Sequence, residues 1–493
     1  MNYYIVYYSA ELLLLWIICI IFFIYLIEKI IYKKDLNKNY LSFVSFLLIF
    51  VLYNILFLNL NVNEPLYLLD NYFVYVNCIQ NIKSFILFLS LIFFIFLYNF
   101  LNIVKLPIFE YIILILIIIL SLFLMLSTNH LFYLFLFLEM VNLSLYVLIG
   151  LNKNSNFGIE IAYKYFIQSS YVTIVGLFGI SLIYFRGGTL FISELHFLMT
   201  SYPSDNLLYF AFFLIFITFF FKLGLFPLHN WVADLYQNAH LSTVVFISVV
   251  PKLPYVYVIL ELYYVVNISR FIFFFLILIG FLSVVYGSIF ALYEASIRRL
   301  LGYGSIVHMG FVILGISTFE LQGVGSAFFY LISYTLLVLN FFLVLLLFID
   351  RKSDNDEVFI IDNITSMNII LNKNTLLSVI FSFIILSLAG LPFFVGFFSK
   401  LYVLLSLISY GYLFLVFILL FINILSTLYY IRLIRFILFI EEKTNKIVQR
   451  PTGVVYSSLL YNAIVFLFIL NILILFFHNY VLLFILNNII IFF

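Results

Sequence analysis

Four lysines and one glutamate lie inside apolar stretches that are long enough to cross a lipid bilayer. These residues are Lys164, Lys222, Lys252, Lys400 and Glu139. A charge at the centre of a membrane helix costs roughly 2.5–3.5 kcal/mol on insertion scales, and residues of this kind mark ion paths and proton relays. The five residues therefore predict a membrane protein that handles charge, with protons as the species that moves.

Glu139 and Lys222 are the two candidates that lie deepest in their stretches. Glu139 occurs in Leu136-Phe137-Leu138-Glu139-Met140, far from either polar flank, and we interpret it as a proton acceptor or as the partner of a buried lysine. Lys222 precedes Gly224 and Pro227, and a lysine held there can gain and lose a proton in turnover. The alternatives are a structural hydrogen bond for Glu139 and a static ion pair for Lys222.

The other three lysines lie nearer to the ends of their apolar stretches. Lys252 stands between Pro251 and Pro254, about eleven residues into its stretch, whereas Lys400 is close to a short turn and Lys164 is a few residues into its stretch. Long lysine side chains can reach the membrane surface from such positions. This alternative is weakest for Lys252 and strongest for Lys164.

Four further polar residues belong to the same part of the chain. His229, Asp234 and His240 follow the Pro227 region and suggest a route for proton entry or exit, or a polar cap between two half-helices. Their spacing does not match HExxH or a similar metal motif. His308 lies in an apolar stretch as either a relay group or a hydrogen-bonded core histidine.

Composition confirms the membrane class and excludes several others. The chain of 493 residues is 67% hydrophobic and 9% charged, whereas an ordinary soluble domain is about 25% charged. Cys19 and Cys78 form no cluster, so an iron–sulfur centre, structural zinc and a disulfide framework are not expected. No nucleotide-binding motif or basic patch for nucleic acid is present. The abundance of Phe and Tyr indicates an AT-biased genome, such as many mitochondria have.

The apolar stretches are continuous runs, which favour helices over the alternating strands of a membrane barrel. We predict an all-α integral membrane protein with about fourteen transmembrane helices. The expected spans are 12–32, 41–60, 84–102, 107–127, 129–151, 161–185, 207–229, 241–265, 271–293, 300–318, 323–349, 375–401, 403–436 and 454–485.

Helices 7 and 12 of this series share an unusual combination of a glycine, a proline and a lysine within an apolar run. Proline removes a backbone donor, and a break at mid-membrane is tolerated only where protein or water satisfies the freed carbonyls. Because the two helices are five apart, we predict two inverted five-helix repeats, helices 4–8 and 9–13, a design that occurs in transporters. The expected units are 1–106 with helices 1–3, the repeats 107–265 and 266–440, and 441–493 with helix 14.

The basic residues are distributed unequally between the two sides of the membrane. Sixteen of the 23 fall in loops after odd-numbered helices, three (Lys83, Arg186 and Arg270) after even-numbered helices, and the remaining four are the intramembrane lysines. The positive-inside rule then places the odd loops on the side of synthesis and both termini on the opposite side. We expect the mitochondrial inner membrane with termini in the intermembrane space, or alternatively the bacterial plasma membrane.

Five segments resemble the antiporter-like subunits of respiratory complex I, and most closely the group of NADH dehydrogenase (ubiquinone) subunit 2, called chain N in bacteria. The segments are Phe137–Met140, Ala162–Phe166, Phe221–Gln237, Arg298–Gly310 and Leu386–Lys400, in the same order as in that family. Two features depart from the family pattern: the segment Ala239–Thr243 replaces a proline-containing turn, and two prolines flank Lys252.

The resemblance implies a role for each charged residue. Glu139 and Lys222 would be the coupled pair, Lys252 would pass the proton along the central axis, and Lys400 would be the terminal relay. Lys164 and His308 match family residues near this path.

The resemblance also implies partners and cofactors. The chain would bind no cofactor, whereas NADH, FMN, iron–sulfur clusters and ubiquinone would belong to other subunits. Its partners would be other membrane-arm subunits, including antiporter-like neighbours, together with phospholipids. The alternatives are a subunit of a multisubunit cation/proton antiporter and the related complex I subunits 4 and 5. A structural subunit that keeps buried ion pairs without transport is a third possibility.

Overall fold

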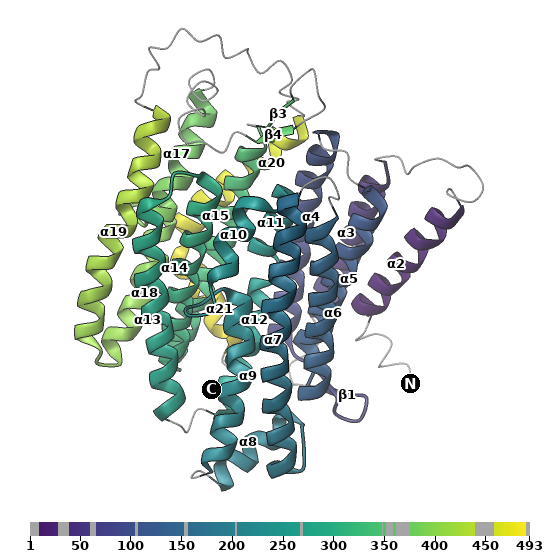
Figure 1. Cartoon of the computed structure of the whole chain (residues 1–493), viewed down its shortest axis with the longest axis vertical. Coiled ribbons are helices and arrows are strands. Elements are labelled where there is room, and N and C mark those ends of the chain that lie inside the picture. The colour runs from purple at the N-terminus through teal and green to yellow at the C-terminus, as the bar shows by residue number, and fades with distance from the viewer. Residues whose placement is uncertain are drawn as a thin grey trace.

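The computed structural model describes residues 9–27, 39–59, 66–103, 107–151, 156–202, 205–266, 270–347, 349–351, 358–360, 375–438 and 458–489. Nearly all of these residues belong to helices that run roughly parallel to one long axis, as Figure 1 shows. The N-terminal helices α2 and α3 lie at one side of the bundle, and α19 lies at the other side. The predicted all-α membrane fold is confirmed.

The helices follow one another in chain order. They are α2 (Ser9–Ile27), α3 (Asn39–Asn59), α4 (Asn77–Ile103), α5 (Ile108–Ser127), α6 (Leu131–Gly150), α7 (Asn156–Gly187), α8 (Ile192–Ser201), α9 (Asn206–Leu223), α10 (Asn230–Asn238), α11 (Leu241–Val249), α12 (Lys252–Val266), α13 (Arg270–Tyr293), α14 (Ile297–Ser317), α15 (Leu321–Leu346), α17 (Thr375–Ala389), α18 (Val395–Ser409), α19 (Leu413–Leu438), α20 (Ser458–Phe476) and α21 (His478–Ile489).

Two short antiparallel strand pairs lie at opposite ends of the bundle. Strands β1 (Leu66–Leu68) and β2 (Phe73–Tyr75) pair with Leu66 opposite Tyr75, near α8. Strands β3 (Ile349–Arg351) and β4 (Val358–Ile360) pair at the other end. The strands lie outside the apolar spans and leave the membrane part entirely helical.

Within the described residues, eleven helices are long and apolar enough to cross a membrane. Four shorter apolar helices, among them the two halves α17 and α18, account for the other places where the sequence predicts a span. The count of fourteen spans therefore remains a prediction. Its boundaries differ most at predicted helices 12 and 13: α18 continues to Ser409, and the chain turns at Gly411, whose φ of 93° favours glycine, before α19 begins.

Helices α9 and α17 both end at a glycine in the left-handed conformation, Gly224 with φ of 72° and Gly390 with φ of 80°. At the first break the amide of Leu225 donates to the carbonyl of Phe220, and at the second the amide of Leu391 donates to the carbonyl of Leu386. Each bond runs from an amide to the carbonyl five residues earlier in the chain, which is the bond that closes a Schellman turn. The two breaks that the sequence predicts are thus formed by the same backbone motif.

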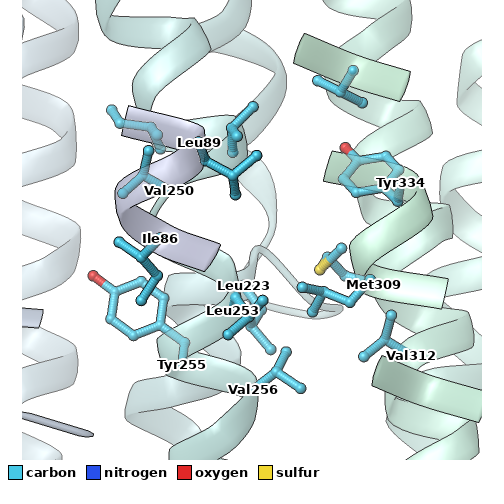
Figure 2. Packing of buried hydrophobic residues seen from close by; sticks show 14 of the residues in the cluster. Ile86, Leu89, Leu223, Val250, Leu253, Tyr255, Val256, Met309, Val312 and Tyr334 are labelled. Carbon is cyan, nitrogen blue, oxygen red and sulfur yellow. The ribbon is translucent and has the colours of Figure 1, made fainter. Parts of the chain in front are cut away.

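Helices α12, α14 and α15 form the centre of the bundle. In these helices every or nearly every residue of the apolar span is buried, whereas α19 and α20 bury about a third or less. Figure 2 shows buried apolar side chains of this centre, with Leu253 and Val256 of α12, Met309 of α14 and Ile86 of α4 among those labelled. The few polar groups at this centre are surrounded by protein rather than by lipid.

Lys83 corrects one prediction. The sequence assigns it to a loop, but α4 begins at Asn77, so Lys83 lies inside the helix, where 1% of its surface is exposed. Its ammonium pairs with Glu11 of α2 at 2.5 Å, and this partner explains how a charge is accommodated there. Most of the basic loop residues, namely Lys29, Lys33, Lys34, Lys38, Lys105, Lys153, Lys352, Lys373, Lys443, Lys446 and Arg450, lie outside the described residues.

Candidate proton-relay site

Three of the predicted lysines are buried beside interruptions of a helix. Lys222 lies two residues before Gly224, Lys252 directly follows the turn at Val250 and Pro251 between α11 and α12, and the Lys400 ammonium reaches back to the break after α17. Their exposed fractions are 4%, 5% and 3%. The amines therefore do not extend to the membrane surface, and the alternative of a surface-reaching side chain is wrong for Lys252 and Lys400.

Lys222 is surrounded by aromatic rings. Its ammonium donates to the hydroxyl of Tyr165 on α7 at 3.3 Å and lies 5.1 Å from the centre of the Tyr165 ring. The indole of Trp231 on α10 packs against Tyr165 and donates to the carbonyl of Phe221, which the break leaves without a regular helical donor. The break after α9 is therefore held by α10, and this fixes the position of Lys222.

Glu139 occupies a half-buried position on α6 and accepts a hydrogen bond from Asn142 at 3.1 Å. Its carboxylate acts on Lys222 electrostatically, but the Lys222 ammonium bonds to Tyr165 instead of forming a contact ion pair. The predicted pair is thus present as two groups near each other, separated by a gap.

Lys164 lies apart from the buried lysines. Its side chain is 52% exposed, and its ammonium pairs with Glu160 one turn earlier on α7, at 2.7 Å. Tyr165, the next residue, points inward to Lys222 instead. The structure therefore places Lys164 on the outer face of α7 and not in the interior row.

Lys252 begins the central part of the row. Its ammonium donates to the hydroxyl of Tyr334 on α15 at 3.2 Å, and the Tyr334 ring lies against the ring of His308, with the ring centres 4.7 Å apart. Tyr255, one turn along α12, is buried, and its hydroxyl has no hydrogen-bond partner among the described residues.

His308 is buried on α14 between two tyrosines. Its Nδ1 lies 2.8 Å from the Tyr330 hydroxyl, and its Nε2 lies 3.2 Å from the Tyr430 hydroxyl on α19. An imidazole with hydrogen-bond partners on both nitrogens can accept a proton on one side and release it on the other. The histidine is therefore both satisfied in the core and placed for relay.

Lys400 ends the row on α18. Its ammonium donates to the carbonyl of Ala389 at 2.8 Å, to Asn423 at 2.6 Å and to Ser426 at 3.3 Å. Ala389 is the last residue of α17, so the lysine satisfies a carbonyl that the broken helix leaves free. Burial is thereby offset by hydrogen bonding.

Two small hollows follow the same row. The first contains His308, Tyr334, Ser387 and Lys400 in its wall, and the second contains Tyr236, Ser305, His308 and Tyr430. The apolar side chain of Leu388 borders both hollows as well. The first hollow has a volume of about 10 Å³, roughly the space of one water molecule, and the second has no room for one.

His229, Asp234 and His240, the polar residues that follow the break after α9, do not form one site. The His229 ring packs against Tyr286 with centres 4.0 Å apart, Asp234 faces Arg299 with 3.7 Å between their charged atoms, and His240 lies near the ring of Phe100. Within the described residues, no group of three or more His, Cys, Asp or Glu side chains could hold a metal ion.

Sequence reasoning missed the tyrosines and one ion pair. Tyr165, Tyr334, Tyr330 and Tyr430 supply the hydroxyls that bond to Lys222, Lys252 and His308, yet among 39 tyrosines none is distinguished by its sequence context. The Glu11–Lys83 pair was also missed, although two charges at the starts of the first and third apolar stretches were a usable signal. The hydroxyls that matter are those brought to the centre by packing.

Comparison with known proteins shows the family. The family model described as "NADH:quinone oxidoreductase/Mrp antiporter, TM" matches residues 127–426, the segment that contains both breaks and the whole row. The chain belongs to this family. Within it, the chain resembles NADH-quinone oxidoreductase subunit N: it is 32% identical over 328 residues to the protein of Francisella tularensis and 29% identical over 319 residues to that of Rickettsia felis.

These alignments cover 64% and 63% of this chain, and 65% and 66% of the two relatives. The chain thus spans slightly less than two thirds of the curated relatives that it matches. A chain in respiratory complex I from Thermus thermophilus with bound aureothin superposes with a TM-score of 0.77 and 24% identity, covering 96% of this chain and 98% of that one. A chain of the Mrp complex from Dietzia superposes with a TM-score of 0.75 and 19% identity, covering 97% and 96%. Both show the antiporter-like fold.

Proposed function

We propose that this chain is a proton-translocating membrane-arm subunit of an NADH:quinone oxidoreductase of the complex I type. The observation that carries the proposal is the buried row of Lys222, Lys252 and His308, which bond in turn to the hydroxyls of Tyr165, Tyr334 and Tyr430, with Lys400 at its end. Family membership and the subunit N relatives support the assignment to this complex. The chain acts as a non-redox part of the enzyme, while NADH, FMN, iron–sulfur clusters and ubiquinone are bound by other subunits.

In the proposed relay, Glu139 and Lys222 form the input, Lys252 and His308 the middle, and Lys400 the output. Movement of the Glu139 carboxylate toward or away from Lys222 changes how strongly the ammonium is stabilised, and this change favours proton transfer along the row. Tyrosine hydroxyls and ordered water bridge the gaps between the ionisable groups. Lys164 acts only as an accessory group on the outer face of α7.

A neighbouring subunit covers the outer face of α6 and α7 in this proposal. Glu139 is half-buried, and the Lys164–Glu160 pair is exposed on both sides, within helices that span the membrane. Charges facing hydrocarbon are expensive, so a protein partner is the favourable cover. Antiporter-like membrane subunits fit this role because they carry polar groups at the same depth.

We further propose that the odd-numbered loops face the side of synthesis and that both termini face the opposite side, on the basis of the charge sorting. The chain is a multi-pass membrane protein, and the curated relatives named above are bacterial. This favours the bacterial plasma membrane over the mitochondrial inner membrane that composition alone suggested.

The substitution Lys222→Met tests the proposal in the assembled complex. We expect NADH:quinone turnover coupled to proton pumping to fall by roughly ten-fold or more, because a positioned acid–base group contributes at least that much to proton transfer. Lys164→Met is the matched control, with a smaller expected loss. Assembly with normal pumping stoichiometry after Lys222→Met would contradict the relay.

The second candidate function is a subunit of a multisubunit cation/proton antiporter, which the fold match to the Mrp complex favours. Native gel electrophoresis separates the two candidates. Co-migration with NADH dehydrogenase activity supports the first proposal, and migration in a smaller complex without that activity supports the second.

A further inference from the structure

We propose that the seam between α4 and α12 binds one phospholipid with a primary ammonium headgroup. Two hollows follow this seam: an apolar groove, and a cavity with a few polar groups toward the end of the bundle where β1, β2 and α8 lie. The inference does not depend on proton pumping, because it concerns residues outside the interior row.

The groove is shaped for an acyl chain. Its volume is about 480 Å³, and its wall is formed by apolar side chains of α3, α4, α15 and α21, including Leu56, Phe85, Ile332 and Phe484. Leu56 and Phe484 are 48% and 60% exposed, so the groove is open toward the surroundings of the bundle. An open apolar groove in a membrane-spanning region is filled by hydrocarbon chains rather than by water.

The cavity has the character of a site for an organic cation. It has a volume of about 320 Å³, and its wall includes Tyr67, Tyr257, Tyr264, His196 and Glu261. Pockets of this size with mainly apolar walls and a few polar groups are typical of small-molecule sites. Aromatic faces together with a carboxylate favour an ammonium group, which aromatic faces attract and a carboxylate neutralises.

Glu261 supplies the strongest sign that something is bound. Its Oε2 is buried and has no hydrogen-bond partner, and no cation of the described chain forms an ion pair with it. A carboxylate in this state is costly unless a partner satisfies it. A primary ammonium offers three donors and a full positive charge in the available space.

The two hollows are arranged in the order of a lipid. On α12, Leu253 borders the groove, while Tyr257 and Glu261, one and two turns farther along the same face, border the cavity. Cys78 of α4 borders both. A single molecule can therefore place its chain beside Leu253 and its headgroup amine at Glu261, where the bundle approaches its surface.

The experiment measures lipid retention by the purified, delipidated complex. Native mass spectrometry counts bound molecules after addition of phosphatidylethanolamine, phosphatidylglycerol or phosphatidylcholine. We expect the wild-type complex to retain one more phosphatidylethanolamine than Glu261→Gln, with roughly ten-fold weaker binding in the variant, because a charge-assisted hydrogen bond contributes about that factor. Leu56→Trp, which fills the exposed mouth of the groove, removes the same molecule.

Glu194→Gln is the matched control, since Glu194 is an exposed acid on α8. It retains lipid like the wild type. Equal retention by Glu261→Gln, equal retention of phosphatidylglycerol, or displacement of the molecule by a short-chain quinone would each overturn the proposal. A loss with Glu194→Gln equal to that with Glu261→Gln would overturn it as well, because the effect would then be one of surface charge.

Discussion

Lys252 of α12 donates a hydrogen bond to the hydroxyl of Tyr334 on α15, with 3.2 Å between the two atoms. The contact joins the two predicted repeats, because α12 belongs to the first and α15 to the second. The Tyr334 ring also packs against His308, so one side chain touches both ionisable groups at the middle of the row. In the proposed relay, a proton that moves from one repeat to the other would pass this tyrosine.

Removing that hydroxyl tests its role. We expect Tyr334→Phe to lower pumping several-fold while it costs only about 0.5–1.5 kcal/mol of folding stability, the net value of one hydrogen bond. The control is Tyr263→Phe, which removes a buried hydroxyl that donates to the Ser317 carbonyl outside the row. Pumping assays on both variants in the assembled complex decide the matter: an equal loss in both would show that the hydroxyl of Tyr334 is only structural.

The glycine at the break between α17 and α18 provides another test. A Cβ at Gly390 would lie 2.9 Å from the ammonium of Lys400, whereas a Cβ at Gly188, with φ of 69°, would meet no atom within 4 Å. Both alanine variants carry the left-handed strain of roughly 1–2 kcal/mol. We expect Gly390→Ala alone to impair pumping, because it also displaces the lysine. Similar pumping in Gly390→Ala and Gly188→Ala would contradict this.

The buried pair of Glu11 and Lys83 leads to a prediction about stability. Removing one partner of the pair leaves the other charge buried and uncompensated, so Lys83→Met should lower the free energy of unfolding by about 3–5 kcal/mol. The double variant Glu11→Leu with Lys83→Met removes both charges and should recover most of that loss. Chemical denaturation of the chain in micelles measures both. A double variant that is as unstable as the single variant would show that the packing, not the charge, matters.

Asp205 leads to a prediction about pH. Its carboxylate caps α9 by accepting from the amide of Leu207 and accepts a second bond from Arg186, which holds the pKa of Asp205 below its ordinary value. A lowered carboxyl pKa stabilises the folded state above the unfolded pKa of about 3.9, and this contribution disappears as the pH falls through the folded pKa.

The wild type should therefore melt at a higher temperature than Asp205→Asn at neutral pH, and the difference should shrink below about pH 4. Thermal melting of the two proteins in parallel measures it, and Arg186→Gln should reproduce the neutral-pH loss. A difference that grows on acidification would show that the sign of the pKa shift is wrong.

The sequence determined the membrane class, the broken helices and the buried lysines. Long apolar runs permit only helices in a bilayer, and a glycine followed by proline ends a helix wherever the chain lies, so local rules were sufficient for Gly224 and Gly390. The lysines were identifiable because a charge within an apolar run is expensive whatever surrounds it.

Tertiary structure alone decided which groups act together. It separated Lys164 from Lys222, although both were candidates. Lys164 lies on the exposed face of α7, whereas Lys222 of α9 is buried and bonds to Tyr165. It selected Tyr165, Tyr334 and Tyr430 from many equivalent tyrosines, and it brought Lys83 to Glu11. The physical reason is that hydrogen bonds and ion pairs act over a few ångströms, and in a bundle of helices such distances are set by packing between segments that are far apart in the chain.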